Sequence, residues 1–246
     1  MGDLLERIKI GCCGFPVARA LYYRTFAVVE VQQTFYQPPQ VATAAKWRSE
    51  APEGFEFVVK AWQLITHQPS SPTYRRLKEP VPPDRHAAYG RFRLTPEVRG
   101  AWARTAEIAQ ALGAKIVLFQ CPASFTCSEE NVANLRTFMR EVDREGFVFA
   151  WEPRGGWSAE LIGQLCKELD LIHVVDPFRT SSVHGRPAYF RLHGITGAGY
   201  RYSNADFAQL VQILQQAGEA YCMFNNMAMF DDARRLLEFL SRTEVH

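Results

Sequence analysis

The chain has 246 residues, a length compatible with one large domain spanning residues 1–246. Its 28 Lys and Arg against 26 Asp and Glu leave a formal net charge of +2, too small to indicate a nucleic-acid protein from bulk charge alone. No stretch approaches the roughly 18 apolar residues that a membrane span needs, and the amino terminus lacks the residue order of a signal peptide. We therefore expect a cytoplasmic protein that contacts no membrane; its oligomeric state is left open.

Short apolar runs recur at fairly even intervals, and most are separated by a stretch with helical periodicity. The eight runs span residues 8–13, 28–31, 55–59, 116–119, 147–151, 172–175, 189–192 and 221–224. Strands that alternate with helices are typical of parallel sheets. Eight such units in a chain of this length predict an α/β fold, a single (β/α)8 barrel of the TIM type.

Helix signals lie between the runs. Thr95-Pro96 is a strong helix start and Gly113 a stop, while Ser128, Ser158 and Ser203 each open a further helix. Residues 38–51 and the segment around 236–240 have similar apolar spacing. We expect the apolar stripes of these helices to pack against the barrel.

The segment 62–94, after the third run, breaks this rhythm. It is rich in proline, and between residues 73 and 93 it carries six basic residues against two acidic ones, with aromatic residues interleaved. Long segments without periodicity in compact domains are often lids or binding elements. We predict a lid or insertion loop that grips an anionic substrate, with a solvated surface excursion as the alternative.

Polar residues at the ends of the runs predict an active site, because barrel enzymes build their sites at the carboxyl ends of the strands. Alternation along the second run places Glu30 on the face opposite Val29 and Val31, and a carboxylate is expected to point into the barrel. We interpret as catalytic Glu30, Lys60, Glu152, Asp176 and His193, and as substrate-binding Gln32, Gln120, Arg154, Arg191, Gly194, Arg201 and Asn225. A salt-bridge plug in which the acids neutralise Lys60 and Arg191 is the alternative.

The ligand expected at this site is anionic. A glycine-rich stretch, residues 194–199, follows the seventh run, where barrels of this type usually bind phosphate, and Arg201 is placed to clamp it. Arg154 and Arg179 add positive charge to the same mouth. A divalent cation, Mg²⁺ or Mn²⁺, is a possible cofactor, with Glu30, Glu152 and Asp176 as its ligands.

Phosphate chemistry without a metal is also open. In that version Lys60 and the arginines stabilise charge, and Glu152 or His193 handles protons.

Six cysteines are irregularly spaced: Cys12, Cys13, Cys121, Cys127, Cys166 and Cys222. Their ordinary interpretation in a chain of this kind is reduced, buried thiols. Adjacent Cys12 and Cys13 must point to opposite faces of a strand, so at most one of them lines the barrel.

Several motifs together resemble the YecE-like family, catalogued as domain of unknown function 72. They are residues 10–15, 29–36, 52–61, 65–67, 118–122 with Phe125, 151–154 with Trp157, 189–194, 200–203 and 224–226. The resemblance covers nearly the whole chain and implies a TIM-type barrel, without supplying a function. Gln32-Gln33 stands where the family usually has Asn-Ser. The Asp usual after the paired asparagines is missing, which weakens a metal model with an acid at strand eight.

Three functional hypotheses follow. The first is a hydrolase of phosphate-containing substrates, a phosphodiesterase or nuclease whose partner is DNA or RNA. The second is an isomerase or lyase of a phosphorylated sugar, in which Lys60 and Glu152 shuttle protons. The third is a non-catalytic module whose lid docks nucleic acid or an acidic protein.

Overall fold

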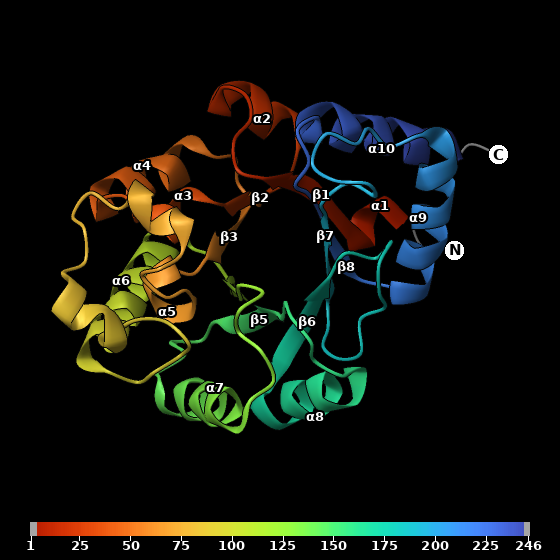
Figure 1. Cartoon of the computed structure of the whole chain (residues 1–246). Helices are drawn as coiled ribbons and strands as arrows, with labels where there is room; N and C mark the ends of the chain where they lie inside the picture. Colours follow the sequence, from red (N-terminus) through yellow and green to blue (C-terminus); the bar gives the residue numbers. More distant parts are fainter. Residues whose placement is uncertain (1–3, 244–246) are drawn as a thin grey trace.

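Eight parallel strands close into a barrel in chain order in the computed structural model, which describes residues 4–243. The strands are β1 (Ile8–Cys13), β2 (Val28–Val31), β3 (Glu56–Lys60), β4 (Ile116–Gln120), β5 (Val148–Glu152), β6 (Leu171–Val175), β7 (Ala188–Leu192) and β8 (Ala220–Phe224). β1 pairs with both β2 and β8, which closes the barrel. The predicted TIM-type barrel is confirmed, and every predicted run overlaps a strand, with bounds that differ by at most one residue (Figure 1).

Helices surround this barrel (Figure 1). They are α1 (Leu4–Arg7), α2 (Arg19–Thr25), α3 (Gln33–Tyr36), α4 (Val41–Glu50), α5 (Gln63–Thr66), α6 (Pro96–Leu112), α7 (Glu129–Glu141), α8 (Ala159–Leu169), α9 (Asn204–Ala217) and α10 (Met229–Thr243). The connection between β6 and β7, residues 176–187, contains no helix. Of the helices within residues 4–243, none combines the length and apolarity that crossing a membrane requires.

The predicted helix starts are confirmed by their hydrogen bonds. The side chains of Thr95, Ser128 and Ser158 each accept from the backbone N–H three residues later, which satisfies a free donor of the first helical turn. Ser203 and Asp206 form a reciprocal capping box at α9. These local contacts fix where each helix leaves its connecting loop.

Strand alternation divides the core into two shells. The inner shell contains Val28, Val58, Leu118, Ala150 and Met223, among others, while the larger outer cluster lies between strands and helices. Two residues beyond each of these five inner residues comes a polar one. The resulting polar layer at the carboxyl end of the barrel consists of Glu30, Lys60, Gln120, Glu152 and Asn225.

The cysteines follow the same division. Cys13 belongs to the inner cluster and Cys12 to the outer one, so the expectation that only one of them lines the barrel is confirmed. All six thiols are free, and five are buried. Cys127 is exposed, in contrast to our expectation, because it lies in the loop just before α7.

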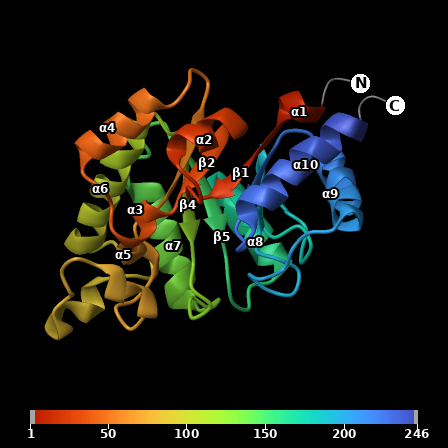
Figure 2. The same cartoon turned by 90° about the horizontal axis from the view of Figure 1, so that it is seen from above.

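Residues 62–94 form a folded segment that projects from the face of the barrel opposite α1 (Figure 2). It contains α5 and two short 3₁₀ helices, Pro72–Arg76 and Pro83–Ala88. Its two ends are joined, because the backbone N–H groups of Gly90 and Phe92 donate to Leu64 and Ile65 at 2.9 Å. Phe92 is fully buried among the aromatic residues of the outer core. The segment is thus anchored at its base.

Gly90 permits this closure. Its φ of +78° favours glycine, and a Cβ at this position would lie 2.3 Å from the carbonyl oxygen of His67. We expect Gly90→Ala to lower the free energy of unfolding by more than about 2 kcal/mol and to speed proteolysis within residues 62–94. Urea denaturation and limited proteolysis measure the two effects.

Gly100→Ala is the matched control. Gly100 lies inside α6, and an added Cβ would meet nothing within 4 Å, so this change should stabilise the protein by about 0.5–1 kcal/mol. Equal stability of Gly90→Ala and the unsubstituted protein would contradict the proposed role of Gly90.

Candidate active site at the carboxyl face of the barrel

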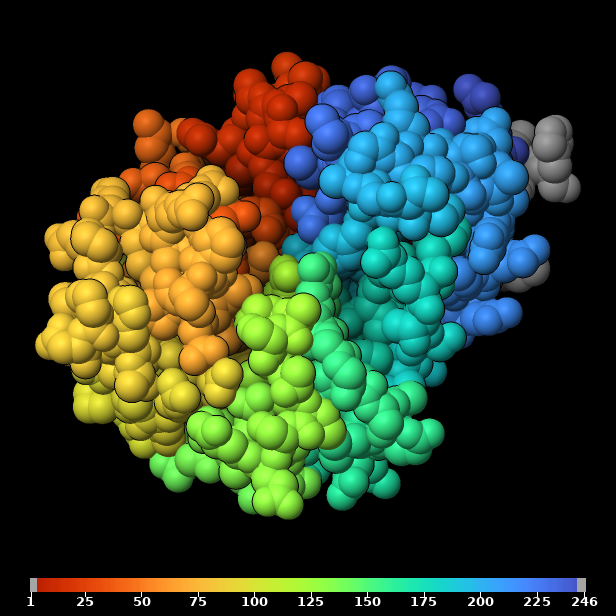
Figure 3. All heavy atoms as spheres, viewed as in Figure 1, coloured from red at the N-terminus to blue at the C-terminus, as the bar shows by residue number. Residues whose placement is uncertain are grey.

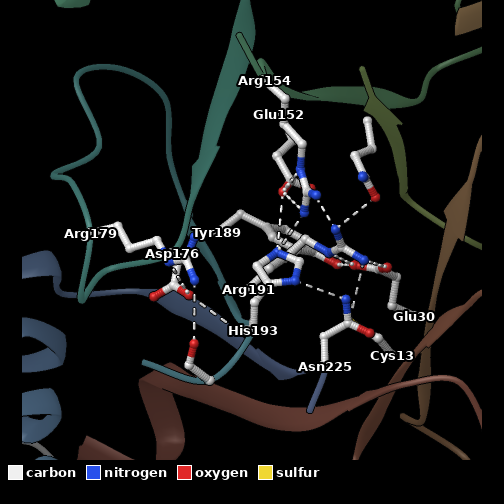
Figure 4. Close-up of polar contacts among 12 residues, drawn as sticks. Cys13, Glu30, Glu152, Arg154, Asp176, Arg179, Tyr189, Arg191, His193 and Asn225 are labelled. Atoms are coloured by element: carbon white, nitrogen blue, oxygen red, sulfur yellow. Dashed lines mark hydrogen bonds and ion pairs between the residues drawn. The ribbon is translucent and has the colours of Figure 1, made fainter. Parts of the chain in front are cut away.

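The guanidinium of Arg191, on β7, is fully buried at the centre of the polar layer, and all five of its N–H groups have acceptors (Figure 4). Two donate to the Glu30 carboxylate at 2.9 and 3.0 Å. One donates to Glu152 Oε2, and the last two donate to Gln120 Oε1 at 3.0 Å and Cys13 Sγ at 3.7 Å. Arg191 has no donor left for a ligand, so this geometry supports a positioning role and not the direct substrate contact that we expected.

The salt-bridge plug that we considered as an alternative is therefore present in part. Glu30 is fully buried, and its second partner is the hydroxyl of Tyr189, which donates to Oε2 at 2.7 Å. Two buried carboxylates beside one guanidinium would be costly without these bonds, because buried charge must be compensated. The plug includes Arg191, Glu30 and Glu152 but leaves Lys60 out.

Glu152 connects the buried cluster to the open mouth. Its Oε1 accepts from Arg154 Nε at 3.1 Å and Nη2 at 2.9 Å, and it lies 3.2 Å from His193 Nε2. Burial would raise the pKa of Glu152, but Arg191, the hydrogen bond from His193 and Arg154 together hold it well below its ordinary value. Glu152 is thus an ionised acceptor.

The contact with the ionised Glu152 carboxylate favours one tautomer of His193. With its proton on Nε2, His193 donates to Glu152, and Nδ1 accepts from the Asn225 side-chain amide at 3.1 Å. Arg154 Nη2, which carries two protons, donates to Glu152 and also lies 3.0 Å from Nε2. A histidine held by a buried carboxylate on one side and facing a displaceable amide on the other is arranged for proton transfer.

Asp176 lies apart from this cluster (Figure 4). Its carboxylate accepts from the backbone N–H groups of His193 and Phe178, each at 3.1 Å, and Arg179 Nε lies 3.8 Å away. It therefore holds the start of the loop after β7, which sets the position of His193. The structure does not bring Asp176 together with Glu30 and Glu152.

The predicted metal set does not fit a resident cation. Both oxygens of Glu30 and both of Glu152 already accept from side-chain donors, mostly arginine, tyrosine and histidine. Across residues 4–243, no three His, Cys, Asp or Glu side chains come together in a group that could hold a metal ion. The assignment of Glu30, Glu152 and Asp176 to Mg²⁺ or Mn²⁺ is therefore not supported, since the sequence did not show that arginines occupy the carboxylates.

Lys60, at the end of β3, is 5 % exposed. Its Nζ lies 3.4 Å from Gln32 Oε1 and 3.9 Å from the centroid of the Phe35 ring. Burial, together with the nearby charge of Arg191, lowers the pKa of Lys60 to about 7 against the opposing effect of Glu30 and Glu152. A substantial fraction of this amine is uncharged near neutral pH.

Two hollows open at the mouth and share Asn225 as a lining residue. The first, of about 770 Å³, is lined by Arg19, Arg76 and Lys78 with Gln32 among its polar groups. The second, of about 730 Å³, is lined by Glu152, Asp176, Arg154, Arg179 and His193 among others. Figure 3 shows this face of the molecule, hollowed near its centre.

The loop of residues 194–199, which we expected to bind phosphate, offers few groups to a ligand. The Gly194 N–H is not free for a ligand, because it donates to the Tyr202 hydroxyl at 2.8 Å. Arg201 is 61 % exposed in its side chain, pairs with Asp231 at 3.6 Å and lines neither hollow. Only Gly197 and Ala198 of the loop line the second hollow. The structure therefore does not support Gly194 and Arg201 as anion ligands.

Some groups at the site were not anticipated. Tyr189 was assigned only to a strand, and its position two residues before Arg191 is the signal that places its hydroxyl on the inner face. Arg19 was not considered, although it opens the helix that follows β1. Tyr36 and Trp47 line the first hollow, and the Arg76 guanidinium lies 3.6 Å from the Tyr36 ring centroid.

Replacing the central guanidinium should destabilise the protein. In Arg191→Met the carboxylates of Glu30 and Glu152 lose their shared partner while staying buried, so the free energy of unfolding should fall by about 3–5 kcal/mol in urea denaturation. Arg234→Met is the control, because the Arg234–Glu238 pair is exposed and should contribute little. A small effect at both positions would show that the cluster does not stabilise the fold.

Lys60 should also give stability a pH dependence. Its folded pKa of about 7 lies below the ordinary value of 10.5, so the unfolded chain binds more protons between these limits and stability rises with pH there. Lys60→Met should remove a slope of at most about 1.4 kcal/mol per pH unit, measured by denaturation from about pH 6 to 10. Lys46→Met, at an exposed position, should leave the slope unchanged. The same slope in both variants would refute the assignment.

Comparison with known proteins places the chain in a family. It is 24% identical over 258 residues to the UPF0759 protein YunF of Bacillus subtilis (strain 168), covering 89% of this chain and 85% of that protein. The structure is similar to a DUF72 family protein (EF0366) from Enterococcus faecalis V583, with a TM-score of 0.71, 24% identity and coverage of 96% and 97%. Endonuclease IV from Thermus thermophilus shares the fold at a TM-score of 0.57 and 11% identity, with 95% and 99% covered. Residues 18–245 match the model of the family described as "Protein of unknown function DUF72", and the chain belongs to that family.

Proposed function

We propose that this protein is a phosphodiesterase that binds a nucleic acid strand across the two hollows and hydrolyses a phosphodiester bond beside His193. The observation that carries this proposal is the chain of contacts from Glu152 through His193 to Asn225, a residue that lines both hollows. It links a group suited to proton transfer with a surface suited to a long anion.

The placement of cations favours an extended ligand. Arg76 and Lys78 line one hollow together with Arg19, which pairs with Glu50. Arg154 and Arg179 line the other beside their partners Glu152 and Asp176. Each hollow alone has the volume of a typical small-ligand pocket, so a small sugar phosphate would use only one of them. A strand with successive phosphates would meet cations on both sides of Asn225.

The first hollow also offers aromatic surface. Phe15, Tyr36 and Trp47 line it, and the guanidinium of Arg76 lies against the Tyr36 ring. Aromatic side chains beside basic ones are typical of single-strand binding grooves, where bases stack on the rings while cations contact the backbone. This combination supports a single-stranded nucleic acid as the substrate class.

The chemistry assigned to His193 is general base catalysis. When a ligand draws the Asn225 amide away, Nδ1 becomes free to accept a proton from water, and the oxygen of that water attacks phosphorus. The P–O bond to the leaving oxygen breaks, that alkoxide takes a proton from solvent, and His193 afterwards releases its own proton to solvent. Glu152 stabilises the imidazolium that forms, since it is ionised and bonded to Nε2. Arg154 and Arg179 stabilise the negative charge that develops on the phosphate oxygens. No step is assigned to a metal, because the carboxylates already have partners.

The shared fold of endonuclease IV from Thermus thermophilus, whose name denotes a nuclease, is compatible with this class of reaction. At 11% identity it concerns the architecture alone. The proposal therefore depends on the residues at the mouth of this barrel.

Substitution of the histidine tests the proposal. With labelled single- and double-stranded DNA and RNA, His193→Ala should reduce the cleavage rate by about 10²–10⁴-fold, the usual contribution of a general base, with little change in strand affinity by fluorescence anisotropy. Cleavage should persist in EDTA. His86→Ala is the control, since His86 is exposed in the segment 62–94 and lines neither hollow.

Two outcomes would overturn it. Equal cleavage by His193→Ala would remove His193 from the mechanism. Strand binding with no cleavage under any condition would favour the non-catalytic module, in which the two hollows only hold the ligand.

A further inference from the structure

Among the described residues, the Lys60 side chain has no carboxylate partner within ion-pair distance. Among the ion pairs of residues 4–243, none joins its Nζ to a carboxylate within 4.0 Å. The two nearest acids, Glu30 and Glu152, are bonded to Arg191 instead. Because a buried ammonium without a counter-charge is unfavourable, the protein holds Lys60 as an amine with a large neutral fraction.

The surroundings of this amine contain little that would protonate it. Phe35 lies beneath Nζ, and the same ring packs edge-on against His67 at 4.9 Å between centroids. Burial and the charge of Lys60 lower the pKa of His67 to about 3, and its Nδ1 is 2.8 Å from the Thr66 hydroxyl. His67 is therefore neutral. Arg191 and Cys13 complete the group of titratable residues around the amine, together with Glu30 and Glu152.

Gln32 contacts this amine and also lines the first hollow, whereas Lys60 itself does not line it. Gln32 contacts Lys60 through Oε1, donates through Nε2 to Glu30, and lines the hollow. Its neighbours Val31 and Cys13 line the hollow as well. A rotation of the Gln32 side chain would open Nζ to a ligand that Arg19, Arg76 and Lys78 hold by its phosphate.

We propose that Lys60 is a nucleophilic amine that forms an imine with the carbonyl carbon of a phosphorylated sugar bound in the first hollow. The lone pair of Nζ forms the N–C bond, the C–O bond breaks, and the oxygen leaves as water with the two protons of the amine. Protonation of the imine nitrogen then makes the neighbouring C–H acidic. Hydrolysis returns the lysine. The inference rests on the anionic ligand of the proposed function but not on phosphodiester hydrolysis.

Two kinds of molecule contain such a carbonyl group beside a phosphate. One is a free sugar phosphate, and the other is the ring-opened sugar of an abasic site in a nucleic acid strand. The unsubstituted protein is incubated with sodium borohydride and either glyceraldehyde 3-phosphate or an oligonucleotide with one abasic deoxyribose. Reduction converts the imine to a stable amine, and intact mass with peptide mapping locates it. We expect one adduct per chain, located at Lys60. Its appearance with glyceraldehyde 3-phosphate or with the abasic oligonucleotide shows which of the two compounds the site accepts.

Variants make the assignment specific. Lys60→Met should abolish the adduct, whereas Lys46→Met, at a solvent-exposed lysine, should retain it. At about pH 7.4 the neutral fraction of Lys60 exceeds that of an ordinary lysine by about three orders of magnitude, so Lys60 should be labelled before the surface lysines. Gln32→Ala should speed trapping by opening the route to Nζ.

Failure of this inference is distinguishable from failure of the proposed function. His193→Ala should still be trapped at Lys60 even where strand cleavage is lost, because imine formation does not use His193. Adducts spread over surface lysines with Lys60 unlabelled, or no adduct in either arm, would overturn the inference. Peptide mapping of the unsubstituted protein gives this result even if Lys60→Met fails to fold.

Discussion

The pairing of the Arg191 guanidinium with two buried carboxylates is the constraint on which the site depends. Glu30 and Glu152 come from β2 and β5, on different sides of the barrel, and Arg191 on β7 meets both. Five donors with five acceptors leave this cluster fixed in geometry, and its two carboxylates exceed its one guanidinium by a single negative charge. The contacts of Arg154, His193 and Gln32 at the mouth are made to the carboxylates of this cluster.

That pairing divides the remaining groups by chemistry. Glu152 keeps one oxygen for Arg154 and His193, so the histidine is oriented with Nδ1 toward the junction of the hollows. Lys60 receives no carboxylate, and burial lowers the pKa of its amine to about 7. The groups proposed for acid–base chemistry and for amine chemistry therefore lie in one barrel mouth.

Much of this layout could be predicted from local pattern. Strand alternation correctly directed Glu30, Glu152 and Arg191 inward, because side chains two residues apart share a face whatever the rest of the chain does. The capping residues, such as Thr95, could also be predicted, since a helix start depends on a few adjacent residues. The position of Arg201 could not be predicted in this way, because the guanidinium pairs with Asp231, which lies far along the chain on α10.

The sequence by itself determined the barrel, the order of its strands and the identity of the polar layer, since periods of two and 3.6 residues are properties of short segments. Only the tertiary structure decided which charges cancel. Pairing energies fall with distance and depend on burial, and closure of the barrel sets the distances between β2, β3, β5 and β7. Closure of the barrel placed Arg191 against Glu30 and Glu152, two of the carboxylates expected to bind a metal. It left Lys60 without a carboxylate partner within residues 4–243.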